Sequence, residues 1–271
     1  MTSPTGTTSI HPAMEPRMPR LILYGVPFSQ PVRAVAWLLL YKRLPFDMVM
    51  INPGSKGETG SRNPTFLAKN PGGTIPTIEE PDTGFTLGEA HAIMCYLSNK
   101  HGWHDVYPID PQQRAKVDWY LHYHHRNVRD ASIGLVAPRI RKDLNFPEAI
   151  LQSAQSNLAR ALKTLDSIWL AQSRYLAGPQ PTLADFAAYV EIGQLQPCFT
   201  NLQAFDAFPN LSRWLEDMQR IEGHDEVHTP LSVLGAIDRE PPSMDTIKNA
   251  NKAGFDALCA SVARMVGEGR A

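Results

Sequence analysis

A run of turn-forming residues followed by an isoleucine–proline pair constrains the fold of this chain more than any other stretch. Asn70 to Gly73 are all turn formers, and the residues from Ile75 to Ile78 have the composition of a short strand. Because proline donates no hydrogen bond to a sheet, Pro76 must lie at the start of a strand or at an edge. The main chain of Ile75 is therefore predicted to be free to pair with a ligand. A tight turn of this kind also tolerates a cis X-Pro bond.

A carboxylate follows this stretch at the beginning of a predicted helix. Residues 84–87 favour a short strand, and Glu89 then opens a helix with Ile93, Met94 and Leu97 on one face. A lone acidic residue in a first turn commonly does no more than complement the helix dipole. Together with the free main chain of Ile75, the carboxylate of Glu89 instead forms a polar clasp, a pair of polar groups suited to a peptide-like ligand.

Periodicity predicts an α/β layer before this clasp. A strand at residues 21–24 precedes a helix from Gln30 to about Tyr41, in which Pro31 occupies the first turn. A second strand at residues 46–51 is apolar enough to suggest a buried sheet, and residues 63–69 form one or two helical turns. The resulting order, β-α-β-α-β-β-α, predicts a thioredoxin-like domain over residues 19–103.

The rest of the chain is predicted to be helical. A proline-containing linker at residues 104–111 leads to an all-helical domain at 112–235, with an apolar stripe of 3.6-residue period at 147–172. Thr182 and Asp185 have the spacing of a capping box, with Asp in place of the usual Glu. Residues 236–271 form an extension that contains an amphipathic helix at 245–268. The fold class is therefore α/β followed by all-α.

Charge and cysteine usage exclude several classes of function. The formal net charge is −1 without a run of like charge, so neither nucleic acid nor an anionic membrane is an expected partner. Three widely spaced cysteines without a Cys-x-x-Cys argue for a reducing, cytoplasmic location and against disulfides or structural zinc. The histidines at 122, 124 and 125 lack metal-ligand spacing, so no metal is expected. Residues 1–18 are expected to be a disordered tail, with organelle targeting as the alternative.

The turn before the first helix is a natural place for a reactive group. A helix N-terminus attracts an anion, and the hydroxyl of Ser29 can donate a hydrogen bond to a thiolate placed there. Both effects lower the pKa of a thiol towards neutrality. A serine at this position is otherwise simply a helix cap. No cysteine precedes Cys95, so the turn itself carries no thiol nucleophile.

The combination of motifs resembles the cytosolic glutathione transferases. Asn-Pro-x-Gly-x-aliphatic-Pro followed by Leu-x-Glu-small-x-Ala-Ile is similar to their glutathione-binding half, and Ser29-Gln30-Pro31-x-Arg33-Ala34 is similar to the theta class. The resemblance implies that Ser29 holds the glutathione thiolate as the catalytic residue. It further implies a glutathione site formed by Gln30, Thr74, Ile75, Pro76, Glu89 and Ala90.

The resemblance also implies partners for the reaction. Glutathione is the co-substrate, a small electrophile is the second substrate, and the protein is expected to be a homodimer with a detoxification role. The electrophile should bind between the domains near His125 and Arg129, and Arg129 falls where theta-class relatives place an anion-binding arginine. The alternative is that these two residues lie on a solvated helix face. The terminal helix could lie over this pocket or make another interaction.

Three departures from the family pattern predict weaker glutathione binding. Ala90 replaces a serine, Thr74 replaces a basic residue, and Thr59 replaces a histidine. Lys56, Arg62 and Lys69 are alternatives for the lost positive charge. The hydroxyl of Tyr24 is an alternative hydrogen-bond donor to the thiolate, although the place of Tyr24 on the strand indicates a core residue.

Two other functions fit the same motifs. A glutathione-dependent dehalogenase or peroxidase would share the thiolate and differ only in the electrophile pocket. A binding or regulatory protein with little turnover is favoured by the three departures, whereas Ser29, the Ile75-Pro76 pair and Glu89 argue against it.

Overall fold

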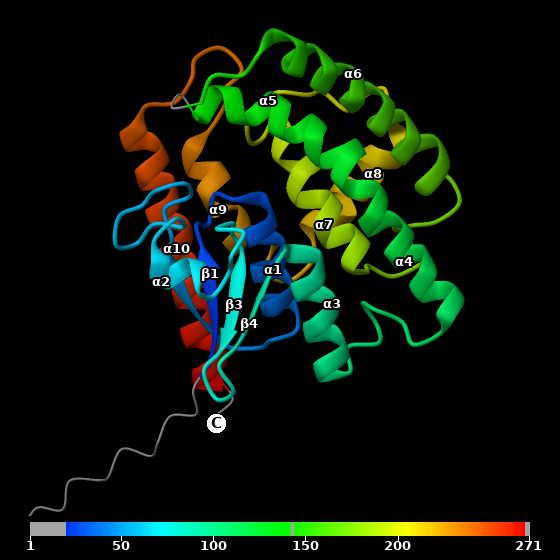
Figure 1. Cartoon of the computed structure of the whole chain (residues 1–271). Helices are drawn as coiled ribbons and strands as arrows, with labels where there is room; N and C mark the ends of the chain where they lie inside the picture. Colours follow the sequence, from blue (N-terminus) through cyan, green and yellow to red (C-terminus); the bar gives the residue numbers. More distant parts are fainter. Residues whose placement is uncertain (1–19, 142–143, 269–271) are drawn as a thin grey trace, which may run out of the picture.

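The computed structural model of the chain describes residues 20–141 and 144–268 (Figure 1). The tail predicted at residues 1–18 lies outside this part of the chain.

The first part of the molecule is a four-stranded mixed sheet with helices packed on it (Figure 1). Its strands follow the order β2-β1-β3-β4, in which β1 and β2 are parallel and the other pairs antiparallel. The element order confirms the predicted thioredoxin-like layer. The elements are β1 (Leu21–Gly25), α1 (Gln30–Tyr41), β2 (Phe46–Met50), α2 (Pro64–Leu67), β3 (Thr77–Glu80), β4 (Phe85–Gly88) and α3 (Ala90–His101).

The prediction that the second strand is buried was wrong. β2 lies at the edge of the sheet, and Phe46 is its only buried residue. Asp47 is exposed and Val49 is 38% exposed, because these two side chains alternate onto the face opposite Phe46. Apolar composition suggested burial on both faces, but strand order decides how much of a strand is covered.

The second part is entirely helical among the described residues. α4 (Pro111–His124) runs through a π-helical segment, η1 (His125–Arg129), into α5 (Asp130–Ile140), and α6 (Glu148–Thr164) ends in a second π-helical segment, η2 (Leu165–Trp169). The second continuous run, α6 with η2, agrees with the apolar stripe predicted at residues 147–172. The remaining helices are α7 (Leu183–Ile192), η3 (Gly193–Leu195), α8 (Pro209–Gln219), α9 (His224–Leu234) and α10 (Met244–Glu268).

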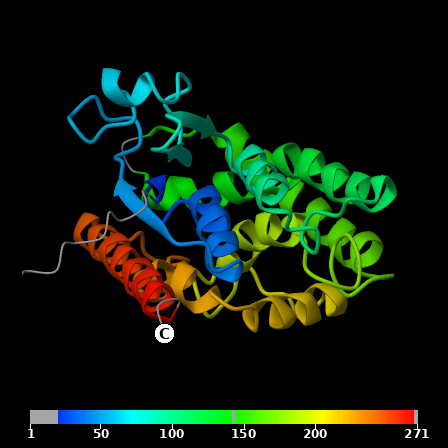
Figure 2. The ribbon, with the colours of Figure 1, turned by 90° about the horizontal axis from the view of Figure 1, so that it is seen from below.

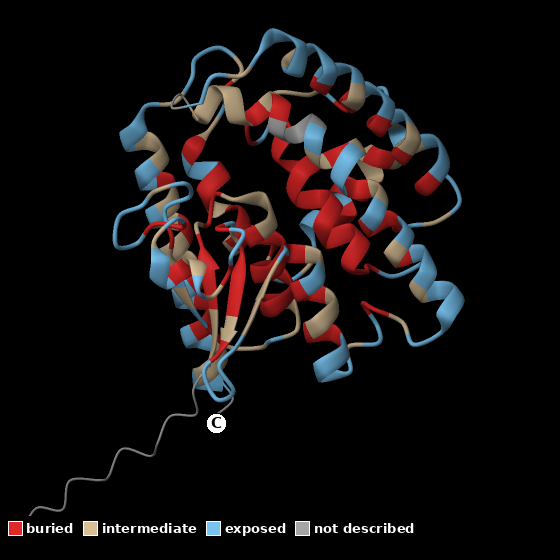
Figure 3. Ribbon diagram, in the orientation of Figure 1, coloured by how far each residue is buried: buried red, intermediate tan, exposed pale blue. Residues whose placement is uncertain are grey.

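Every residue of α7 is buried, and this helix joins the two parts of the molecule (Figure 3). Trp37 of α1 is fully buried and makes edge-to-face contacts with Phe186 and Tyr189 of α7, at ring distances of 5.0 and 5.3 Å. Its indole nitrogen donates to the carbonyl of Glu222 at 3.0 Å. One hydrophobic core therefore runs from the sheet into the helices, so that elements of the second part can position loops of the first.

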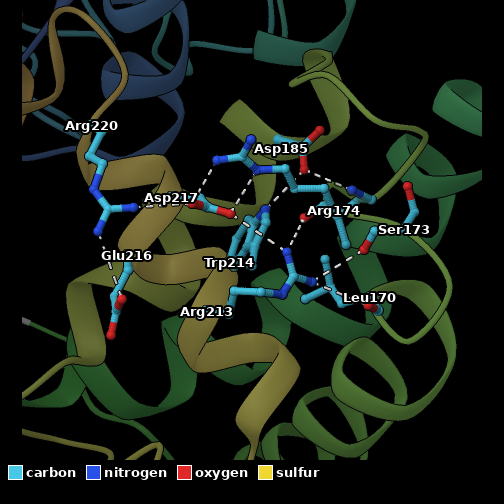
Figure 4. A network of polar contacts seen from close by, with 10 residues as sticks. Leu170, Ser173, Arg174, Asp185, Arg213, Trp214, Glu216, Asp217 and Arg220 are labelled. Carbon is cyan, nitrogen blue, oxygen red and sulfur yellow. Dashed lines mark hydrogen bonds and ion pairs between the residues drawn. The ribbon is translucent and has the colours of Figure 1, made fainter.

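The predicted capping box at the start of α7 is confirmed. The carboxylate of Asp185 accepts hydrogen bonds from the main-chain N–H of Thr182 and of Leu176, both at 2.9 Å. It also accepts from the indole N–H of Trp214 at 3.0 Å (Figure 4). Asp185 is fully buried, so each of these donors depends on this one side chain.

Replacing Asp185 by alanine should therefore strongly destabilise the fold. The change leaves several buried donors without an acceptor, at a cost of about 1–3 kcal/mol each, so we expect the free energy of unfolding to fall by roughly 3–5 kcal/mol. Urea denaturation measures it. Asp225→Ala is a matched control, since this carboxylate is 93% exposed and should cost at most about 1 kcal/mol. A loss of less than about 1 kcal/mol in Asp185→Ala would contradict the assignment.

Candidate functional site

Three chain connections meet at one end of the sheet, and together they carry most of the predicted site. β3 runs antiparallel to both β1 and β4, with Thr77 opposite Tyr24 on one side and Gly88 on the other. The carboxyl ends of β1 and β4 therefore lie beside the amino end of β3. This arrangement brings the turn with Ser29, the Ile75-Pro76 pair and Glu89 to the same end of the sheet.

The backbone of Ile75 is open, as the sequence predicts. The Ile75-Pro76 bond is cis, and β3 begins only at Thr77. Neither the N–H nor the C=O of Ile75 has a hydrogen-bond partner within residues 20–141 and 144–268. A half-buried peptide with both groups unpaired can accept an antiparallel strand-like ligand.

Asn70 holds the turn that presents Ile75, a role that sequence reasoning missed. Its side-chain amide donates to the carbonyl of Thr74 at 3.0 Å and to the hydroxyl of Thr77 at 2.9 Å. Its side-chain oxygen accepts from the N–H of Gly72 at 3.0 Å. One buried asparagine thus ties both ends of the turn to the start of β3. The signal in the sequence was an asparagine opening a turn-forming run, where a short amide side chain bonds its own backbone.

Glu89 stands in an unusual backbone conformation next to this turn. Its φ of 66° lies in the left-handed region, which costs a non-glycine residue about 1–3 kcal/mol. The side chain is exposed, and its carboxylate has no hydrogen bond or ion pair with any residue that the structure describes. Ala90, which begins α3, is buried. A strained residue that holds an unpaired carboxylate over a helix N-terminus is suited to bind a ligand carrying both an ammonium and a carboxylate.

The hydroxyl of Ser29 is available for a ligand. Ser29 occupies the cap position of α1, but its side chain makes no capping hydrogen bond. The residue is half-buried, as is Gln30, the first residue of the helix. The interpretation as a simple cap therefore does not describe this hydroxyl, which remains a free donor beside a positive helix end.

A buried arginine fixes the backbone just before Ser29. Arg33 is 1% exposed and donates to the carbonyl of Phe28 at 2.5 Å. It also donates to the carbonyl of Val190 at 3.0 Å and to the side chain of Gln194 at 3.1 Å, both in the helical part. Burial lowers the pKa of Arg33 to about 10. Arg33 was part of the predicted motif, but its role in holding the turn appears only in the structure.

The structure distinguishes among the three basic residues that could replace the positive charge lost near Thr74. Lys69 forms an ion pair with Glu79 at 2.6 Å, so its charge is already balanced. Lys56 is exposed on its loop. Arg62 lies against the turn before exposed Thr74, since a Cβ added to Gly73 would be 2.9 Å from Nη1 of Arg62. Its guanidinium has no ion pair with any described residue, which makes it the best-placed cation.

Tyr24 is a core residue, as predicted. It is 9% exposed, its ring packs edge-on against Phe66, and its hydroxyl donates to Glu79 at 2.5 Å. Burial, together with the bond to Glu79, raises the pKa of Tyr24. The tyrosine is therefore engaged away from the turn, which leaves Ser29 as the hydroxyl donor there.

His125 and Arg129, the candidates for the electrophile site, both lie in the π-helical segment η1. His125 is exposed and its ring lies 4.6 Å from that of His91, the residue after Ala90. This contact places the segment beside the glutathione-binding candidates on α3. Arg129 pairs with the buried carboxylate of Glu191, so its charge is compensated. A π-helical turn often marks a functional position.

Two negative findings bear on the chemistry of this part of the chain. Residues 20–141 and 144–268 contain no group of three His, Cys, Asp or Glu side chains arranged to hold a metal ion. Their helices also include none that is long and apolar enough to cross a membrane.

Comparison with known proteins identifies relatives for both parts of the chain. The family model of the glutathione S-transferase N-terminal domain matches residues 23–105, and that of the C-terminal domain matches residues 148–217. Human glutathione S-transferase theta-1 is 30% identical over 233 residues, which are 84% of this chain and 94% of that protein. Glutathione S-transferase T2 of Arabidopsis thaliana is 32% identical over 228 residues, but the chain spans only 37% of its length.

The same similarity is found among solved structures. Human glutathione transferase theta-2, in a complex with glutathione and an unknown ligand, superposes with a TM-score of 0.68 at 26% identity. The superposition covers 90% of this chain and 99% of that one.

The half-buried histidine His91, next to the site, should make stability fall in mild acid. Burial lowers the pKa of His91 to about 3, below the 6.5 of an exposed histidine. Between these values the unfolded chain binds a proton that the folded chain does not. The free energy of unfolding that depends on an uncharged His91 is thus fully present above about pH 6.5. It is lost as pH falls, by about 2 kcal/mol at pH 5.

The variant His91→Gln tests this dependence. We expect the difference in unfolding free energy between pH 7 and pH 5 to be about 2 kcal/mol smaller than in the unmodified chain, as measured by urea denaturation at both pH values. His122→Gln, at an exposed position on α4, should keep the original difference. An unchanged pH dependence in His91→Gln would show that this histidine is not buried uncharged.

Proposed function

The chain belongs to the glutathione S-transferase family, and we propose that it activates the thiol of glutathione with Ser29 and transfers the sulfur to small electrophilic substrates. The observation that carries this proposal is the convergence of three unpaired groups at one end of the sheet. They are the hydroxyl of Ser29, the backbone of Ile75 and the carboxylate of Glu89. Theta-class relatives of similar length support it.

Each part of glutathione has a matching group at this edge. The N–H and C=O of Ile75, presented by Pro76, would pair with the cysteinyl residue as an added strand does. Glu89 would bind the γ-glutamyl ammonium, and the N–H of Ala90 at the start of α3 would bind the γ-glutamyl carboxylate. At the other end, Arg62 would approach the glycyl carboxylate across the turn that contains Thr74.

The reaction then needs only a stabilised thiolate. The sulfur would lie at the N-terminus of α1 beside Gln30, where the hydroxyl of Ser29 donates to it and the helix dipole favours its negative charge. The thiol proton leaves to solvent, and the thiolate attacks an electrophilic carbon while the leaving group departs with the bonding electrons. No step requires a metal or redox cofactor.

The second substrate would lie against α4 and the segment η1. His125 is exposed there, whereas Arg129 is bound by Glu191 and would have to break that ion pair to hold an anion. The site therefore favours small uncharged electrophiles over anionic ones. A dehalogenase or peroxidase would use the same thiolate. The homodimer and the cytoplasmic location also stay predictions.

Removing the hydroxyl of Ser29 tests the mechanism. A hydrogen bond to a charged group contributes about 1.5–3 kcal/mol, so Ser29→Ala should lower the conjugation rate roughly 10- to 100-fold. The pKa of bound glutathione, measured by ultraviolet titration, should rise by about 1–2 units. Glutathione affinity should change only a few-fold. Ser55→Ala, on the loop after β2, is a control that should behave as the original chain.

The outcomes separate the enzyme from a binding protein. A bound thiol that ionises well below its free value in the original chain, but not in Ser29→Ala, supports an activated thiolate. An unshifted thiol in both proteins would favour the binding or regulatory alternative that Ala90, Thr74 and Thr59 suggest.

Neutralising Glu89 should instead affect binding. Glu89→Gln removes the charge that faces the γ-glutamyl ammonium, and we expect the KM for glutathione to rise about 10-fold or more, with a smaller change in kcat. Steady-state kinetics with varied glutathione measures both constants. Glu58→Gln changes an equally exposed carboxylate on the loop after β2 and should leave KM unchanged. Equal KM values for the two variants would remove Glu89 from the site.

A further inference from the structure

The C-terminal helix α10 reaches the turn that carries Ser29. This 25-residue helix packs along α9 and lies beside β2 and α1 (Figure 2). From its second turn, the side-chain oxygen of Asn251 accepts a hydrogen bond from the main-chain N–H of Phe28 at 3.0 Å. Phe28 is the residue immediately before Ser29.

The amide of Asn251 is held in the orientation that this contact needs. Its nitrogen donates to the carbonyl of Ile247, one turn earlier on α10, at 3.1 Å. The oxygen is therefore the atom left to face Phe28. The side chain is half-buried, which limits competition by water for the bond.

A glycine one turn after Asn251 allows the helix to come close enough. A Cβ added to Gly254 would be 2.7 Å from Cβ of Pro27 and 2.9 Å from Cδ of Pro230 on α9. Distances below 3.0 Å are not adopted by real Cβ atoms, so only glycine fits at this point of contact. The backbone of α10 thus rests directly on the same turn that Asn251 binds.

Phe28 is consequently held from two sides. Asn251 binds its N–H from α10, while Arg33 binds its carbonyl and is itself bonded to α7. The N–H of Ser29 is fixed within the turn by the carbonyl of Val26 at 3.0 Å. The N–H and C=O groups of both Phe28 and Ser29 are therefore engaged, since the N–H of Arg33 also donates to the carbonyl of Ser29 at 2.9 Å, and the hydroxyl of Ser29 is left for a ligand.

We propose that Asn251 is a positioning residue, through which α10 sets the place of the Ser29 hydroxyl relative to the glutathione sulfur. The inference rests on the proposed function of Ser29. A hydrogen bond to a developing thiolate is sensitive to displacements well below 1 Å, and such displacements lower rates without removing any reacting group. The helix then acts on catalysis through the backbone of the turn, without touching either substrate.

A double-mutant cycle tests this role in the full-length chain. Asn251→Ala should lower kcat about five- to tenfold and raise the pKa of the bound glutathione thiol, while the glutathione KM changes less than about threefold. Asn249→Ala, an exposed asparagine on the same helix, should match the original chain. In the Ser29→Ala background, Asn251→Ala should have no further effect on kcat or on the thiol pKa.

A second variant approaches the same contact from the backbone. Gly254→Ala pushes α10 away from Pro27 and should reproduce the kinetic changes of Asn251→Ala. Thermal unfolding of each variant shows whether it folds. If Asn251→Ala unfolds, Gly254→Ala carries the cycle with Ser29→Ala.

The possible results are distinct. If both α10 variants keep the kcat and thiol pKa of the original chain while Ser29→Ala loses activity, the positioning role of Asn251 is overturned and the function of Ser29 stays intact. If Asn251→Ala lowers kcat by the same factor in the original chain and in the Ser29→Ala background, the effect is a general structural one, and the positioning role is again overturned. A Ser29→Ala variant with unchanged thiol pKa would refute the proposed function and this inference together.

Discussion

The buried guanidinium of Arg33 is the interaction on which the rest of the site depends. A charge removed from water costs several kcal/mol unless it is paired and hydrogen-bonded. The two terminal nitrogens of Arg33 donate to the carbonyls of Phe28 and Val190 and to the side chain of Gln194, and the nearby carboxylate of Glu191 favours the charged form. Its Nε has no hydrogen-bond partner among the described residues, so the charge depends on these few acceptors. These acceptors come from both parts of the chain. The arginine therefore stays buried only while α7 is packed on α1, and the turn before Ser29 keeps its shape for the same reason.

Because Arg33 connects the two parts of the molecule, each part contributes to the site in a different way. The end of the sheet supplies backbone groups and carboxylates through short local devices, such as the Asn70 turn and the positive φ of Glu89. The helices fix the turn over long sequence distances, through the carbonyl of Val190 on α7, which accepts from Arg33, and through Asn251 on α10. An isolated sheet domain would keep the clasp for the peptide but lose the restraints on the turn. A hydroxyl that donates a hydrogen bond to a thiolate needs those restraints more than groups that only bind the peptide do, because reaction rates depend on small displacements.

The local features were predictable from the sequence and the long-range ones were not. The cis proline, the start of α1 at Gln30 and the Thr182–Asp185 box all depend on chemistry within a few residues. The edge position of β2, the pairing of Arg129 with Glu191 and the contact of Asn251 with Phe28 depend on which elements become neighbours. Within the domain predicted to be helical, no separate helix was predicted over α9, because Pro230 and two histidines interrupt its apolar pattern. These residues form part of the buried face of the helix.

The departures from the family pattern fall on groups proposed to bind glutathione and not on those proposed to activate its thiol. Thr59 is engaged with Asn52, and Lys69 with Glu79, so neither restores a charge for the glycyl end of glutathione. Ala90 retains only a backbone N–H for the γ-glutamyl carboxylate. The groups proposed to surround the sulfur show no such loss, since the side chain of Ser29 makes no capping hydrogen bond and its turn is held by Arg33 and Asn251. Interactions that act equally on bound substrate and transition state change KM, whereas those at the reacting sulfur change kcat. This chain should therefore differ from its relatives in how tightly it holds glutathione, and resemble them in what it does once glutathione is bound.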